Sequence, residues 1–280
     1  MLSYRHAFHA GNFADVLKHI VLTRILAHLA AKPKPFCCID THAGAGQYDL
    51  TSAPALKNRE FDNGIGRLWH RTDLPPVVAQ YREVVSRLNG SGELRRYPGS
   101  PWLERMWLRP RDRLILFELH PTEFVALEGF AARDSRISIA KEDGFAACIG
   151  LLPPAERRGL VMIDPSYEIK TDYRQAIDTL IQAHRRFSTG IYAVWYPVID
   201  RRRANTLERA VQNSGIRRIQ LFELGIRPDA EGSGLTASGM IVVNPPWTLW
   251  PEMQEALPWL ARTLGQHDTG FYRSYELAGE

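Results

Sequence analysis

The stretch FCCIDTHAGAGQYDL, residues 36–50, determines how the rest of the chain is interpreted. A short apolar run ends at Asp40 and passes directly into a turn that contains Gly44 and Gly46. Glycine permits a tight turn in which the backbone can approach a ligand closely. Asp49 stands where a dinucleotide-binding fingerprint has its third glycine, and the turn has no P-loop lysine. The pattern predicts a strand followed by a ligand-facing turn, and it disfavours a pyrophosphate ligand.

Apolar runs and helical patterns alternate along the rest of the chain. The expected strands are residues 36–40, 114–119, 137–140, 160–164, 191–196, 219–224 and 240–245. Helical patterns lie between most of them, for instance at 121–132 and 172–186. Strands that are apolar throughout are typical of a parallel sheet covered on both faces. The order predicts a Rossmann-like α/β fold, with a seven-stranded, mostly parallel sheet and helices on both faces.

Two segments fall outside this repeating pattern. A helix capped by Asn12 precedes the first strand and makes an N-terminal extension. The first two strands are then separated by about 70 residues, far more than a simple crossover needs. Part of that segment, at 77–88, has a helical pattern. We therefore expect one domain, formed by residues 1–49 and 97–280, with a helical insertion at 50–96.

Composition narrows the class of protein. The chain has 280 residues, a net charge of +4 and an apolar fraction typical of globular proteins. No apolar run approaches the ~20 residues of a membrane helix, and the N-terminus lacks the apolar segment of a signal peptide. Cys37, Cys38 and Cys148 have no metal-binding spacing and are expected to be buried thiols. These features predict a cytoplasmic protein without membrane association.

The basic residues are clustered in the sequence. The clusters are Arg95-Arg96, Arg157-Arg158, Arg185-Arg186, Arg201 to Arg203 and Arg217-Arg218. If several of them share a face, that face can bind a polyanion such as nucleic acid. For any single pair of arginines, a solvated surface is the better explanation.

Acidic residues follow the second and third expected strands. Glu118 ends the second strand, and Asp143 with Gly144 follows the third. Because the carboxyl ends of parallel strands meet at one edge of the sheet, ligands bind there. An acid like Glu118 can hold ribose hydroxyls, although it can also cap the following helix. Asp143 can accept a hydrogen bond from an adenine amino group.

The fourth strand delivers a short acidic hook. In GLVMIDPSYE, residues 159–168, an apolar run ends in Asp164-Pro165-Ser166-Tyr167. A second hook of the same shape, Asn244-Pro245-Pro246-Trp247, ends the run at 239–248 and fits the pattern better because it has both prolines. Chain order favours the first hook as the site of chemistry. Three expected strands follow it, whereas we expect no strand after Trp247.

The glycine turn, the ribose acid, the adenine acid and the acidic hook come at the ends of successive strands. This order resembles class I S-adenosylmethionine-dependent methyltransferases that act on an exocyclic amino nitrogen. Within that class, the segments MLSYRHAFHAGNFADVLKH, DTHAGAGQYDL, YPGSP, DPSYEIKTDY and TASGMIVVNPPW resemble the bacterial 23S ribosomal RNA adenine-N6 methyltransferases of the J type. The resemblance runs from the N-terminus to at least Trp247 and includes the insertion.

The resemblance implies an enzyme that uses S-adenosylmethionine as donor and no metal. It implies a 23S ribosomal RNA substrate, naked or at an early stage of assembly, and a monomeric enzyme. The donor site would be lined by Lys18, His19, His42, Ser100, Glu118, Asp143, Gly144 and Asp164. Tyr4 would meet the substrate.

The residues of the hook suit methylation of an amino group. The Asp164 carboxylate and the Pro165 carbonyl can each accept one hydrogen of an adenine amino group, which directs its lone pair at the donor. Tyr167 can stack on the base. Ser166 stands where the family usually has a second proline. Proline fixes the backbone angle φ at about −65°, whereas serine can adopt this angle but does not enforce it.

The N-terminus offers candidates for contact with RNA. Tyr4, Arg5 and His6 suit stacking and phosphate contact with a single strand. An arm that merely packs on the domain remains an alternative, and His6 with His9 as metal ligands is disfavoured because the sequence offers no partner ligands.

Three other functions share parts of this pattern. A DNA adenine-N6 methyltransferase would use the same hook. Methylation of a protein glutamine typically uses an asparagine in place of Asp164. A non-catalytic RNA-binding protein with a degenerate methyltransferase site is favoured only by Ser166.

Overall fold

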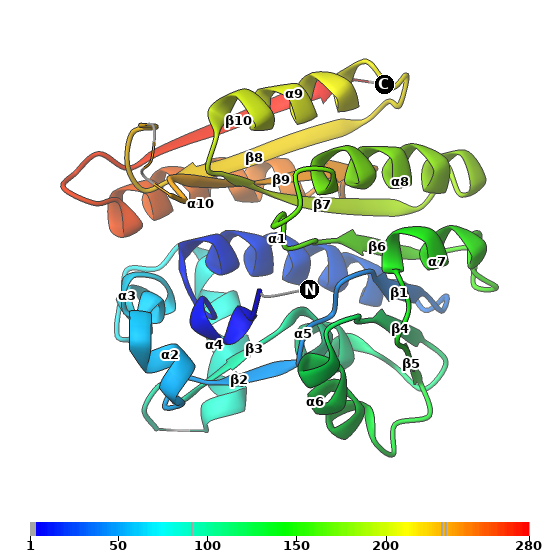
Figure 1. Ribbon diagram of the computed structural model, residues 1–280, viewed down its shortest axis with the longest axis horizontal. Coiled ribbons are helices and arrows are strands. Elements are labelled where there is room, and N and C mark those ends of the chain that lie inside the picture. Colours follow the sequence, from blue (N-terminus) through cyan, green and yellow to red (C-terminus); the bar gives the residue numbers. More distant parts are fainter. Residues whose placement is uncertain (1–3, 91, 231, 233, 280) are drawn as a thin grey trace.

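The computed structural model describes residues 4–90, 92–230, 232 and 234–279, and its main feature is an eight-stranded sheet (Figure 1). The strand order is β10-β8-β9-β7-β6-β1-β4-β5. The strands are β1 Cys37–Asp40, β4 Arg113–Phe117, β5 Ile137–Ala140, β6 Gly159–Ile163, β7 Ile191–Val198, β8 Ile219–Gly225, β9 Ala237–Val243 and β10 Phe271–Ala278. Strands β5, β4, β1, β6 and β7 are parallel, and β9 runs antiparallel between β7 and β8. The expected doubly wound α/β class is confirmed.

The expectation that no strand follows Trp247 was wrong. Strand β10 pairs antiparallel with β8 at the edge of the sheet. Its sequence, FYRSYELA, is not a continuous apolar run, because several of its side chains are exposed. Arg273 of β10 instead bonds to Glu208 and to the fully buried Glu223 of β8. A strand stabilised by such ion pairs lacks the apolar signal on which the sequence prediction depended.

Helices cover both faces of the sheet. One face carries α1 Phe13–Ala30, α4 Pro76–Asn89, α5 Ser100–Trp107, α6 Pro121–Ala131 and α10 Leu249–Leu264. The other carries α7 Gly144–Gly150, α8 Asp172–Arg186 and α9 Arg201–Gln212. Each face has its own cluster of buried apolar side chains. Cys37, Cys38 and Cys148 are buried free thiols, as expected.

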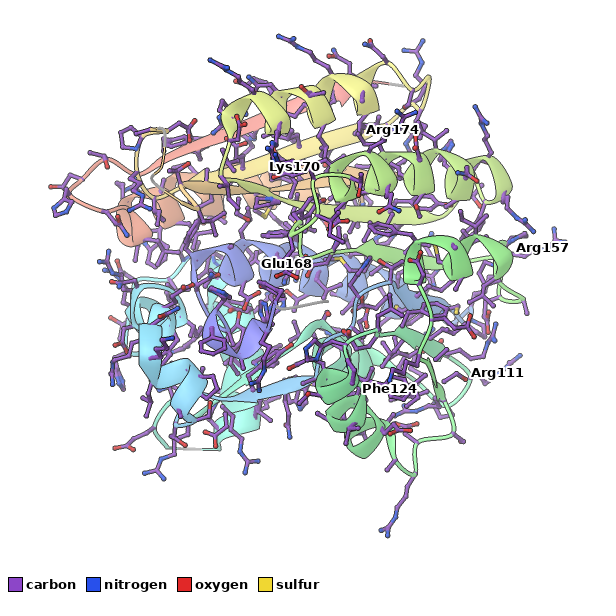
Figure 2. All side chains as sticks on the ribbon, viewed as in Figure 1. Arg111, Phe124, Arg157, Glu168, Lys170 and Arg174 are labelled. Carbon is purple, nitrogen blue, oxygen red and sulfur yellow. The ribbon has the colours of Figure 1, made fainter. Side chains whose placement is uncertain are left out.

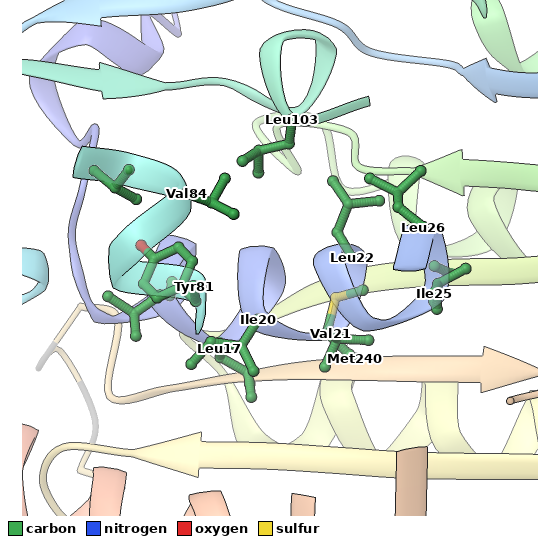
Figure 3. Close-up of a cluster of buried hydrophobic side chains, with 14 of the residues drawn as sticks. Leu17, Ile20, Val21, Leu22, Ile25, Leu26, Tyr81, Val84, Leu103 and Met240 are labelled. Atoms are coloured by element: carbon green, nitrogen blue, oxygen red, sulfur yellow. The ribbon is translucent and has the colours of Figure 1, made fainter. Parts of the chain in front are cut away.

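Helix α1 lies at the centre of the molecule. Its N-cap is Asn12, whose side-chain oxygen accepts hydrogen bonds from the next turn, as expected. Nearly every side chain of the helix is buried. Figure 3 shows its apolar residues between Met240 of β9 and side chains of α4 and α5, among them Tyr81 and Leu103. A helix that is buried on nearly all sides must be surrounded by protein, and α1 is covered by both the sheet and the 50–96 segment.

The 50–96 segment is helical. It contains α2 Ala53–Asn58, a 3-10 helix Glu60–Asn63, α3 Ile65–Trp69 and α4. Two short strands flank it, β2 Gln47–Asp49 and β3 Arg96–Pro98, which pair antiparallel. Its treatment as an insertion in a single domain stays a prediction.

No helix in the described part of the chain is both long and apolar enough to cross a lipid bilayer.

Truncating a buried side chain of α1 is expected to destabilise the whole protein. Leu22 is fully buried, so Leu22→Ala leaves a cavity and should lower the free energy of unfolding by about 2–5 kcal/mol. Leu56 of α2 is 44% exposed, and Leu56→Ala should change it by less than about 0.5 kcal/mol. Urea denaturation of both variants measures the difference. Equal losses would contradict the central position of α1.

Candidate functional site

A cavity of about 700 Å³ opens at the carboxyl ends of the parallel strands. The chain runs from β1 outward to β4 and β5, then returns to β6 on the other side of β1. Such a switch point leaves a crevice beyond the strand ends. The ends of β1 and β6 lie side by side there: the backbone N–H of Thr41, directly after β1, donates to the carbonyl of Met162 in β6 at 3.0 Å. The cavity is therefore a product of the strand order.

The glycine turn after β1 is tied to Glu118 after β4. The backbone N–H of Gly44 donates to Glu118 Oε2 at 2.8 Å, and that of His120 donates to Oε1 at 2.6 Å. Gly44 has φ +62°, and a Cβ on it would meet the Tyr48 hydroxyl at 2.4 Å. Burial raises the pKa of Glu118, and the hydrogen bonds from the two backbone donors partly offset this rise. Both Gly44 and Glu118 line the cavity.

Asp40, at the end of β1, organises the floor of the cavity. Its carboxylate accepts hydrogen bonds from the Ser100 hydroxyl at 2.6 Å and from the His42 backbone at 3.1 Å. Burial raises the pKa of Asp40 to about 7. Burial also lowers the pKa of His42 to about 3, so its ring is neutral. Ser100 and His42 line the cavity, whereas the fully buried Asp40 supports them from behind.

Asp143 and Gly144 begin α7 at the cavity wall. Asp143 is the N-cap, and its side chain accepts a hydrogen bond from the Phe145 backbone at 3.0 Å. A Cβ on Gly144 would lie 2.0 Å from the Thr41 carbonyl oxygen, so only glycine fits. The Phe145 ring meets the His42 ring edge-on, with 4.6 Å between centroids. The third strand end is thereby held against the first.

The acidic hook (residues 164–167) follows β6, and its Asp164 is paired with Lys18 of α1. Lys18 Nζ lies 2.7 Å from Asp164 Oδ2 and 2.9 Å from Asp15 Oδ1. Burial disfavours the charge on Lys18, but the two carboxylates outweigh burial and raise its pKa. Burial raises the pKa of Asp164, and the Lys18 ammonium limits that rise. Burial opposes ionisation of Asp15 as well, yet His6 and Lys18 hold its pKa well below the usual range.

The rest of the hook is held by aromatic contacts. Tyr167 has φ +56°, and its hydroxyl donates to the Trp195 carbonyl. Its ring centroid lies 4.5 Å from that of Tyr173 and 5.7 Å from that of Trp195. Pro165, Ser166 and Tyr167 all line the cavity.

The N-terminal arm (residues 4–12) closes one side of the cavity. Tyr4 Oη lies 2.8 Å from His6 Nδ1, and His6 Nε2 lies 2.8 Å from Asp15 Oδ2. A chain of hydrogen bonds and ion pairs thus connects the arm through Asp15 and Lys18 to the hook. The structure brings Tyr4 and His6 to the cavity wall, but Arg5 lies outside the lining and pairs with Glu123 at 3.9 Å.

His19 lines the cavity, and one of its ring nitrogens has no partner within the described chain. Its Nδ1 bonds to the Tyr97 hydroxyl at 2.9 Å, and that hydroxyl bonds to Tyr81 at 2.6 Å. Its Nε2 is buried and has no hydrogen-bond partner within the described chain. Burial lowers the pKa of His19 to about 3, so the ring is neutral. A buried nitrogen without a partner is costly, which suits a position that a ligand completes.

Several residues that line the cavity were not predicted from the sequence. Asp15 is three residues before Lys18, and this helical ion-pair spacing was the available signal. His9 bonds to Glu60 of the 50–96 segment at 2.8 Å, which raises the pKa of His9. No local pattern predicts that contact. His6 and His9 therefore each face a carboxylate, and no metal-binding group of three or more side chains occurs among the described residues.

The second hook (residues 244–247) lies at the other end of the strands, beside the amino end of β7. Strand β9 runs antiparallel to β7, so its carboxyl end faces away from the cavity. Asn244 Nδ2 donates to the carbonyls of Ser188 and Gly190 at 2.8 and 2.7 Å. The side chain of Asn244 therefore stabilises the loop before β7, and only the acidic hook lines the cavity.

Comparison with known proteins gives concordant matches along nearly the whole chain. A protein-family model described as "Ribosomal RNA large subunit methyltransferase D, RlmJ" matches residues 33–276. The chain is 48% identical over 270 residues to the ribosomal RNA large subunit methyltransferase J of Escherichia coli, with 96% of each chain covered. The protein of that name from Haemophilus influenzae is 48% identical over 271 residues, again with 96% of each chain covered. A crystal structure from Legionella pneumophila aligns with a TM-score of 0.88 and 37% identity over 96% of this chain and 98% of that chain.

Proposed function

The chain belongs to the RlmJ family of ribosomal RNA large subunit methyltransferases, and we propose that it methylates the N6 amino group of an adenine in 23S ribosomal RNA. The methyl donor is S-adenosylmethionine, whose sulfonium carries an electrophilic methyl group. The observation that carries the assignment to an amino nitrogen is the acidic hook. Its Asp164 is held against Lys18 at the wall of the cavity.

The residues around the cavity suit the donor. Glu118 can accept hydrogen bonds from ribose hydroxyls, because each carboxylate oxygen has further lone pairs beyond its one backbone donor. Asp143, which lines the cavity beside Gly144, can accept from an adenine amino group. His19 Nε2 offers a polar contact that the described protein leaves unused. These contacts support the donor site, which we assign to Lys18, His19, His42, Ser100, Glu118, Asp143, Gly144 and Asp164.

The acidic hook positions the acceptor nitrogen. Lys18 binds Asp164 Oδ2, which leaves Oδ1 to accept one amino hydrogen, while the Pro165 carbonyl accepts the other. Both bonds favour a pyramidal nitrogen whose lone pair points at the donor methyl. The Lys18 charge favours the ionised carboxylate that these bonds require. After transfer the nitrogen must lose a proton, and Asp164 is the nearest acceptor.

The target base must leave its stack to reach the hook. Such extrusion costs a few kcal/mol, least for an unpaired base, and orientation of two bound reactants can lower the barrier by ~7–11 kcal/mol. Tyr167 and Tyr4 supply aromatic faces at the cavity for the base. We further propose a monomeric cytoplasmic enzyme that acts on naked or early-assembly RNA.

Donor binding is expected to depend on Glu118. Loss of a hydrogen-bonded carboxylate costs about 1.5–3 kcal/mol, so Glu118→Ala should weaken S-adenosylmethionine binding at least tenfold. Asp143→Asn should weaken it too, since asparagine keeps the helix cap and removes the charge. Glu128→Ala on the exposed side of α6 is the control. Isothermal titration measures all three, and wild-type affinity in a folded Glu118→Ala variant would contradict the donor site.

Methyl transfer is expected to require the acidic hook and not the second hook. Asp164→Ala should lower the single-turnover rate on unmodified 23S ribosomal RNA by at least ~100-fold, the lower end of acid–base contributions. Asn244→Ala should keep most of the rate at a temperature where it is folded. Nucleoside mass spectrometry identifies the product as N6-methyladenosine or another base, and a matched DNA tests the deoxy substrate. An active Asp164→Ala beside a folded but inactive Asn244→Ala would reverse the assignment.

A further inference from the structure

A second hollow lies between α8 and α9, outside the catalytic cavity. It is a groove of about 550 Å³ whose walls come from both helices, which pack side by side. Its apolar floor includes Ile177 and Leu207. Its basic residues are Lys170, Arg174, Arg202 and Arg203. Asp178 is the one acidic residue among the described residues that line it.

The groove and the cavity share a wall. At the start of α8, Asp172 and Gln175 line the cavity, whereas Tyr173 and Arg174 line the groove. The same division occurs after β7, where Ile199 lines the cavity and the first turn of α9 lines the groove. Figure 2 shows Lys170 and Arg174 near α9, with Glu168 nearer α1. The groove therefore begins where the acidic hook ends.

Tyr173 forms this shared wall. Its ring lies 4.5 Å from that of Tyr167 in the hook, and its hydroxyl donates to the Pro197 carbonyl at 3.3 Å. Pro197 itself lines the cavity. Only the side chain of Tyr173 separates the hook from the basic groove. An RNA strand whose target base lies in the cavity can therefore continue directly into the groove.

The basic residues of the groove are available to an external anion. Lys170 and Arg202 are exposed, and no ion pair to either side chain occurs within the described chain. Arg174 pairs with Asp178 at 3.4 Å, with the two side chains 88% and 53% exposed. Arg203 pairs with Asp200 at 3.5 Å, also at the surface. Exposed pairs of this kind contribute little stability, so phosphate oxygens can replace their carboxylates.

We propose that this groove binds the single-stranded RNA that flanks the target nucleotide. The inference rests on the proposed function and adds the path of the substrate. Lys170, Arg174, Arg202 and Arg203 hold phosphates, and the apolar floor receives the face of an unpaired base or its ribose. A positively charged groove that follows the nucleic-acid backbone is a general means of binding single strands without reading their sequence.

The test compares two double variants that remove the same charge. Lys170→Ala/Arg202→Ala removes the unpaired cations of the groove. Arg185→Ala/Arg217→Ala removes two exposed arginines that lie away from the groove, at the end of α8 and just before β8. Thermal unfolding and donor titration establish that both variants are folded and bind S-adenosylmethionine like wild type.

The groove variant is expected to raise KM for a long ribosomal RNA fragment about tenfold and to leave kcat unchanged. The slope of log KM against log salt should fall by about 0.7 for each lost phosphate contact. Both effects should disappear on fragments whose flanks are trimmed to the target nucleotide and its immediate neighbours. The control variant should behave like wild type on every fragment.

Two failures are distinguishable. If wild type methylates the long fragment and the groove variant matches the control in KM and salt slope, the groove does not bind the flanking strand. If wild type methylates no RNA fragment at all, the proposed function fails and the inference fails with it.

Discussion

The site depends on one buried ammonium group, that of Lys18, placed between the carboxylates of Asp15 and Asp164. A buried charge is costly unless it is paired, and removing one partner of such a pair is strongly destabilising. The three groups therefore fix one another. Because Lys18 belongs to α1 and Asp164 to the loop after β6, the pairing sets the distance between helix and hook. His6 extends the network to the N-terminal arm.

The same helix connects the core with the chemistry. The apolar side chains of α1 pack between the sheet and α4, as Figure 3 shows, while the polar side chains of its first two turns, Asp15, Lys18 and His19, line the cavity. Displacement of α1 would therefore move Lys18 and His19 together. The 50–96 segment contributes twice, since α4 covers α1 and Glu60 bonds to His9 of the arm. Fold stability and site geometry are consequently maintained by the same contacts.

Sequence patterns predicted those features that local chemistry determines. Apolar runs identified seven strands, and the residues directly after them, such as Glu118 and Asp164, meet at one cavity because parallel strands end at one edge. Contacts between distant segments were not predictable in this way. Strand β10 has no apolar run in its sequence and is held partly by ion pairs of Arg273 with Glu208 and Glu223, which are distant in the chain. The role of Asp15 was hidden because an acid in the first turn of a helix also suits its N-terminus.

The central claim is that Lys18 keeps Asp164 ionised for methyl transfer. Its most direct test is the pH dependence of single-turnover methylation at saturating S-adenosylmethionine for wild type, Lys18→Arg and Lys18→Met. The rate should rise with pH as Asp164 loses its proton. Because Lys18 limits the burial-driven rise in the Asp164 pKa, Lys18→Met should displace this rise in rate to higher pH, whereas Lys18→Arg should displace it less. A Lys18→Met profile with the wild-type midpoint, lowered by one factor at every pH, would contradict the account.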